Sequence, residues 1–341
     1  MADTAKTVSE EKDPGSLTEE EVELVLDYLL SRKMAYAQDF LRARNLAFSG
    51  TKAMLRQRLE EYLGDGRVEA VELLRLLNRV EGWGNQHIYL YRASDQLIEP
   101  WLREDSARKR LTDLGLGDLF DRPRPLVLPV TAALSSVEWT PEQMRFVWVE
   151  RRGWEERAPG EDIEEKAMVW RAYRLNVARG LVTFDWDLVS GHAMLMIQRL
   201  PRGTQYAPIR DRFERELEPI VGLSLFEPVR VSRAIQRLQA SDEVLGRQLA
   251  YQTRRGGKAT FTSAGRSRDM FADPDLARAG QALESGVAGL LGNFYWFPVE
   301  GGLGRELHCK IYASDQRVGI FGEHLEKDVR YVLFRIRHYC L

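Results

Sequence analysis

The segment FLRARNLAFSGTKAMLRQRLEEYL, residues 40–63, carries the clearest structural signals in the chain. Its first part predicts the end of a helix over residues 36–44, followed by an extended stretch over 45–50. Its second part predicts a helix over residues 52–63, because three leucines recur at i, i+4 and i+8 and would form one buried face. These are Leu55, Leu59 and Leu63. The segment therefore predicts a helix, an extended loop and a second helix.

The turn between these two helices has the composition of an anion-binding site. Gly50 can adopt backbone angles that other residues avoid, so the chain can approach a phosphate closely. Thr51 and Lys52 place a hydroxyl, free backbone amides and a cation at a helix start, where the helix dipole favours anions. Arg56 follows Lys52 by one helical turn, on the same side of the helix. We expect this turn to bind phosphate groups.

The charge around the turn supports this expectation. Seven basic residues stand against Asp39 alone between residues 32 and 58, inside a chain of net charge −2. They are Arg32, Lys33, Arg42, Arg44, Lys52, Arg56 and Arg58. A local excess of this kind is typical of nucleic-acid binding. A plain helical hairpin with a solvated basic face is the alternative.

The segment resembles the SAP domain, a small helix, extended loop and helix module that binds duplex DNA. The resemblance covers about 35 residues, and Phe40 stands where that family usually has Leu. It implies that Arg44, Ser49, Gly50, Thr51, Lys52 and Arg56 contact double-stranded DNA. Phosphate contacts carry no sequence information, so little sequence specificity and a strong salt dependence are expected.

Further helices are predicted on both sides of this segment. Thr18 and Glu21 form a capping box at the start of a helix over residues 18–32, and another helix is expected over 68–80. Residues 1–16 are polar and predict a disordered tail. We therefore predict an all-helical, SAP-like domain over residues 17–80.

The remaining residues, 83–341, show no family resemblance and predict one or more α+β domains with a mainly antiparallel sheet. A sub-boundary is expected near residues 121–140. The clearest hairpin spans residues 181–200, where alternation places Asp185 and Asp187 on its solvent side. Further expected strands are 87–91, 143–151, 166–176, 293–299, 305–313 and 329–337, with a charged loop over 153–165; residues 126–130 suit either a buried strand or an extended connector. Helices are expected over 206–220, 228–239 and 273–284.

A second basic segment spans residues 247–268 and contains no acidic residue. It predicts a hairpin that turns at Gly256 and Gly257. Its tip carries three candidate DNA-binding cations: Arg254, Arg255 and Lys258. Nearby aromatic residues either stack on bases or pack in the core, and the sequence leaves both alternatives open. They are Tyr251, Phe261 and Phe271.

Enzyme signatures are weak. The five histidines lack metal-ligand spacing, no phosphate-binding glycine loop is present, and we expect neither a metal nor a cofactor. Glu164, Glu165 and Lys166 have the Glu-x-Lys spacing of one nuclease family, with Asp162 just before, but they are expected in a loop. A non-enzymatic DNA-binding protein is therefore favoured. The alternative is a metal-dependent nuclease of a defence or mobile-element system, tethered by the SAP-like module.

Composition limits the setting in which the protein acts. Two cysteines are too few for a disulfide framework, and no apolar run approaches the length of a membrane span. We expect a cytoplasmic protein, nucleoid-associated if bacterial. Its expected partner is double-stranded DNA, with a protein partner through the C-terminal region as a further alternative.

Overall fold

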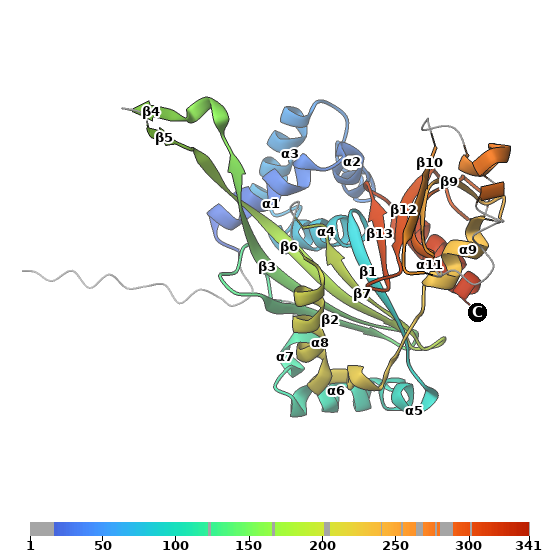
Figure 1. Cartoon of the computed structure of the whole chain (residues 1–341). Coiled ribbons are helices and arrows are strands. Elements are labelled where there is room, and N and C mark those ends of the chain that lie inside the picture. Colours follow the sequence, from blue (N-terminus) through green and yellow to red (C-terminus); the bar gives the residue numbers. More distant parts are fainter. Residues whose placement is uncertain are drawn as a thin grey trace, which may run out of the picture.

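In the computed structural model, residues 17–121, 124–165, 168–200, 205–239, 241–253, 255–263, 269–276, 278–279, 289–300 and 302–340 are described. The predicted α+β class is confirmed: helices at the N-terminus precede a large antiparallel sheet (Figure 1). The expected tail at residues 1–16 lies outside the described residues. No helix in the described ranges has the length and apolar character needed to cross a membrane.

Four helices form the N-terminal module: α1 (Glu19–Ser31), α2 (Met34–Arg42), α3 (Lys52–Gly64) and α4 (Ala70–Trp83). The predicted capping box is present, since the Glu21 amide donates to Thr18 Oγ1 at 3.2 Å and the Thr18 amide donates to Glu21 Oε2 at 2.9 Å. The predicted stripe also packs inward, with Leu55 and Leu59 fully buried. A single apolar core therefore holds the four helices together.

The sheet runs in the order β10-β9-β11-β12-β13-β1-β7-β6-β3-β2, with every pair antiparallel. A short strand, β8, pairs with β1, while β4 and β5 form a separate two-stranded sheet. The strands are β1 (Gln86–Arg92), β2 (Ala133–Thr140), β3 (Gln143–Arg157), β4 (Ile163–Glu165), β5 (Met168–Trp170), β6 (Tyr173–Asp187), β7 (His192–Gln198), β8 (Glu227–Pro228), β9 (Val244–Gln252), β10 (Lys258–Thr262), β11 (Gly289–Trp296), β12 (Leu307–Tyr312) and β13 (Arg317–Phe321).

Each end of the sheet buries a different face. Toward β9–β13 the buried face packs against α9 (Ser232–Gln239) and α11 (Glu326–Cys340). Toward β2, β3 and β6 the opposite face packs against a second set of helices. That set is α5 (Asp95–Ile98), α6 (Glu104–Asp113), α7 (Gly117–Asp121) and α8 (Ala207–Val221); short 3₁₀ helices span Glu99–Trp101, Pro159–Glu161, Leu223–Leu225 and Met270–Ala272.

Two expected elements are wrong. Residues 329–337 lie in helix α11 rather than in a strand, and four of their apolar side chains are buried at helical spacing: Val329, Val332, Leu333 and Ile336. The expected loop over 153–165 is partly strand, because β3 continues to Arg157 and β4 follows. Of the two alternatives for residues 126–130, the connector holds, since these residues pair with no strand, and Val127 joins the core of the helical module.

Asp185 also differs from the expectation, since its side chain is buried rather than solvated. Arg145 Nε and Gln143 Nε2 donate to Asp185 Oδ2 at 2.9 and 2.6 Å, and Arg330 Nη2 donates at 2.9 Å. Arg330 comes from α11, the helix that the sequence did not reveal. Asp187 caps the β6–β7 turn, where its carboxylate accepts from the Val189 and Ser190 amides.

A buried ion pair joins the helical module to the sheet. Arg179 of β6 bonds to Glu81 of α4, and both side chains are fully buried. Arg32, just after α1, donates to the other oxygen of Glu81 at 2.7 Å, and Arg179 also reaches the Asn78 side chain. Since a buried carboxylate between two guanidinium groups is tightly held, this contact fixes α4 on β6.

Candidate nucleic-acid interface

The turn into α3 is open to solvent. Ser49, Gly50, Thr51 and Lys52 are all exposed, and Gly50 has φ +129°, in the region that favours glycine. Thr51 is the N-cap of α3 and accepts from the Met54 amide in a long contact of 3.4 Å. The amides of the first two helical residues precede any intrahelical acceptor, so they are directed at solvent or at a ligand. The turn therefore presents amides, a hydroxyl and a cation together.

Two arginines that the sequence indicated only as part of the charge excess lie beside this turn. Arg58 donates to the Ser49 carbonyl, so its guanidinium lies next to the turn. Arg42 lies over the Phe48 ring at 4.4 Å and also bonds to Asp39. Both contacts cross the loop from a flanking helix. They place basic groups on the side of the turn that faces the extended stretch.

The other side of the turn is acidic. Arg56 bonds to Glu23 and Asp27 of α1 and to Glu60 of α3, the last at 2.8 Å. The hydrogen bond that Arg56 donates to Asp27 is the largest cause that raises the pKa of Arg56. One guanidinium among three carboxylates leaves excess negative charge there. The guanidinium of Arg56 is therefore already bound by carboxylates of the module and is not available to a phosphate.

Arg44 is also engaged within the module. Its Nη2 donates to Glu72 of α4 at 2.7 Å, and its guanidinium lies 3.7 Å from the centre of the Phe40 ring. The hydrogen bond from Arg44 is the largest cause that lowers the pKa of Glu72. Of the predicted site residues, the structure therefore brings Ser49 to Lys52 together at an open corner, and it pairs Arg44 and Arg56 with acidic side chains.

The second basic segment forms the predicted hairpin, β9 and β10. The Thr253 amide donates to the Gly257 carbonyl at 2.7 Å, and Gly256 has φ +83°. Arg255 and Lys258 are exposed, whereas Arg254 lies outside the described residues. Tyr251 is fully buried in the core and is therefore not placed to stack on bases. Phe261 packs partly against the same core, and the Phe271 side chain is outside the described residues.

The carboxylates considered for a nuclease are dispersed. Glu164 and Glu165 are exposed on β4, in the two-stranded sheet beyond the far end of β3 and β6 (Figure 1), and Lys166 lies outside the described residues. Asp162 bonds to Arg157 and to the Ala172 amide. Within the described ranges, no group of three or more His, Cys, Asp or Glu residues is placed to hold a metal ion.

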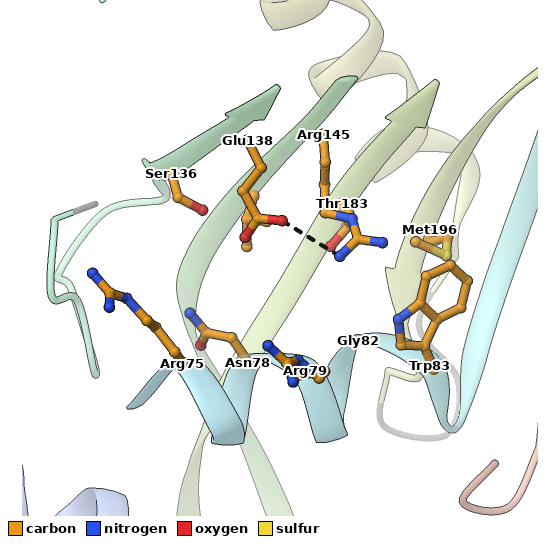
Figure 2. A pocket seen from close by; sticks show the side chains of 11 residues that line it. Arg75, Asn78, Arg79, Gly82, Trp83, Ser136, Glu138, Arg145, Thr183 and Met196 are labelled. Carbon is orange, nitrogen blue, oxygen red and sulfur yellow. Dashed lines mark ion pairs between the residues drawn. The ribbon is translucent and has the colours of Figure 1, made fainter. Parts of the chain in front are cut away.

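A further cluster of polar side chains lies between α4 and the sheet (Figure 2). The two sides enclose a cavity of about 150 Å³. Three arginines, two hydroxyls and one carboxylate line it, and Arg145 is already paired with Glu138 and Asp185. Its polar lining is Arg75, Asn78, Arg79, Ser136, Glu138, Arg145 and Thr183.

Comparison with known proteins agrees with the motif at the α3 turn. No curated protein matches the chain significantly. The rest of the chain has no family match. Residues 38–64 match the SAP domain family, which covers α3 and the loop that precedes it, and this match supports nucleic-acid binding by the N-terminal module.

Proposed function

We propose that the protein binds double-stranded DNA through its N-terminal module, which contacts the phosphate backbone with little sequence specificity. The exposed turn at Ser49 to Lys52 carries this proposal, because its amides, hydroxyl and cation are directed outward together. Backbone amides at a helix start and a nearby lysine are suitable ligands for phosphate oxygens. The SAP match over the same residues supports it.

The distribution of charge around the turn indicates the path of the DNA. The carboxylates around Arg56 would repel phosphates, whereas Arg58 and Arg42 lie on the opposite side of the turn. We infer that the backbone passes from Lys52 toward Arg58 and Arg42. Arg44 and Arg56, which the SAP resemblance also implicates, would then act mainly by keeping α1, α3 and α4 in position.

The test is the binding of full-length protein to a short DNA duplex. Lys52→Glu removes one phosphate contact and adds repulsion, so we expect a loss of about tenfold or more at low salt. The slope of log K against log salt should become smaller by about one. Lys109→Glu is the matched control, since Lys109 is exposed on α6. Equal affinity of the Lys52→Glu variant and the unmodified protein would contradict the proposal.

A further inference from the structure

The five strands at one end of the sheet, β9 to β13, contain no aspartate or glutamate. They contain four basic residues: Arg247, Lys258, Lys310 and Arg317. The long strands at the other end, β3 and β6, carry several acidic residues. This end of the sheet is therefore suited to a polyanion, independently of the helical module.

Only one face of these five strands is covered by described helices. Phe294, Cys309 and Ile320 point toward α9 and α11 and belong to the core there. Their neighbours point the other way, as alternation requires, and among these neighbours Tyr295, His308, Lys310 and Phe321 are half-buried. Tyr295 pairs with His308 across β11 and β12, and His308 pairs with Phe321 across β12 and β13. The outward side chains therefore form a row across the strands.

This row is a ladder of aromatic rings. Tyr295 and His308 stack with centroids 4.4 Å apart and an interplanar angle of 5°, and His308 stacks on Phe321 at 4.8 Å. His87 of β1 ends the row: it meets Phe321 edge-on at 6.0 Å, and its side chain is buried against Tyr206. Rings that stack from one strand to the next have their planes roughly perpendicular to the sheet. The ladder therefore presents the edges of its rings, not their faces, to the outside. A flat base laid over such edges makes the edge-to-face contact that aromatic pairs prefer.

Cations flank the ladder. Lys310 Nζ and the Arg199 guanidinium each lie 5.7 Å from the centre of the Phe321 ring. Neither has a carboxylate partner among the described residues. Arg317 lies over Tyr206 and Tyr312, at 4.4 and 4.3 Å, and pairs with Asp315. Two cations without a carboxylate partner in the described ranges therefore lie beside the rings, within reach of the phosphates of a bound strand.

Basic groups continue beyond the ladder in both directions. On one side Lys258 and Arg255 are exposed on the β9–β10 hairpin. On the other side Arg199 also lines a groove of about 850 Å³ that contains Trp154 and Arg152, with Glu155 and Glu156 in its wall. The surface is thus long enough for several nucleotides rather than for one small ligand.

We propose that this outer face of β9–β13 binds single-stranded DNA, with Lys310 and Arg199 on phosphates and the ring ladder against bases. A single strand is the occupant that fits, because bases in a duplex are already stacked on each other and cannot reach the rings. The site is separate from the proposed duplex contact at Lys52. It would let one protein hold a duplex and an adjacent single strand.

The test compares oligo(dT) of about 16 nucleotides with a duplex, using full-length protein and fluorescence anisotropy. Lys310→Gln with Arg199→Gln should weaken oligo(dT) binding about tenfold and leave duplex binding unchanged. Lys52→Glu should do the reverse, which separates this proposal from the previous one. Lys109→Gln is the control for loss of an exposed charge. Unchanged oligo(dT) affinity in the double variant, or no oligo(dT) binding by the unmodified protein, would overturn the proposal.

A second pair of variants tests the ladder itself. Tyr295→Leu removes a ring and should weaken oligo(dT) binding by about tenfold, whereas Tyr295→Phe keeps the ring and should bind as the unmodified protein does. Thermal unfolding of both variants checks that the sheet is intact. Equal binding by the Leu and Phe variants would show that the rings do not contact bases, and would overturn the proposal.

Discussion

Residues 32–58 of the helical module and the five strands β9–β13 are both basic in sequence, yet they arrange their cations differently. In the module, Arg44 and Arg56 each meet carboxylates from other helices or from one turn away. In β9–β13 no acidic side chain is present, and Lys310 lies beside an aromatic ring. In the module, packing of the helices brings acidic side chains of one helix next to basic side chains of another. In β9–β13 the strands contribute basic side chains and no acidic ones, so the cations find no partner within these strands. A local charge count therefore overstates the free charge of the helical region.

The largest expected effect concerns the junction between the helical module and β6 of the sheet. Glu81→Ala leaves the buried Arg179 without its carboxylate and also removes the partner of Arg32. Breaking a buried ion pair by removing one partner costs about 3–5 kcal/mol, so the free energy of unfolding in urea should fall by that amount. A fall below ~1 kcal/mol would show that the module and the sheet are stabilised independently.

Glu138→Ala is the matched control for this prediction. Glu138 pairs with Arg145 at 3.5 Å, but its side chain is 59% exposed. Exposed pairs contribute about 0–1 kcal/mol, so this variant should unfold close to the unmodified protein.

The second prediction concerns the strand region and pH. Burial lowers the pKa of His87 to about 3, with Arg317 and Arg199 adding to the shift, while an unfolded histidine titrates near 6.5. Between these values the unfolded chain binds a proton that the folded chain does not, so stability decreases as pH falls from 6.5 toward 3. Between pH 7 and pH 5 this contribution is about 2 kcal/mol.

His87→Phe removes the titrating group and keeps a ring in the ladder. Its free energy of unfolding should therefore fall less between pH 7 and pH 5 than that of the unmodified protein, by about 2 kcal/mol. Urea unfolding at the two pH values measures this difference. Parallel decreases in both proteins would show that His87 is not the group responsible.

The smallest expected effect concerns the two sides of the turn into α3, the acidic side around Arg56 and the basic side around Arg58 and Arg42. Glu23→Gln removes one of three carboxylates around Arg56, one turn from Lys52. Duplex affinity at low salt should rise about twofold, and the gain should disappear at high salt because screening weakens the repulsion. Glu99→Gln, at an exposed position far along the chain, should leave affinity unchanged. A decrease in the Glu23→Gln variant would place the DNA on the Arg56 side of the turn.

Local signals predicted much of the helical module. The capping box at Thr18 and the leucine stripe of α3 depend on residues a few positions apart, so the sequence contains them in full. The outward direction of Ser49 to Lys52 followed from the same local pattern. The partners of Arg56 did not, because two of them come from α1, about thirty residues earlier in the chain.

Two errors in the sheet region share one cause. Residues 329–337 are rich in residues that favour strands, and they were expected to close the sheet; instead they form α11. That helix brings Arg330 to Asp185, which was expected to face solvent. Because residues 329–337 were expected to form a strand, no helix was expected to cover the face of the β6–β7 hairpin that carries Asp185. The ladder of Tyr295, His308 and Phe321 was also not predicted, since its rings lie in three strands whose order the sequence does not contain.

The contact between Glu81 and Arg179 has a mechanical consequence. A DNA-binding module on a flexible linker can reorient relative to the rest of its protein. The helical module cannot, because the Glu81–Arg179 contact fixes it on β6. If its loop engages a duplex as proposed, the sheet is held in a fixed orientation relative to the backbone that the loop contacts. Any strand leaving that duplex would then depart at a set angle to the sheet.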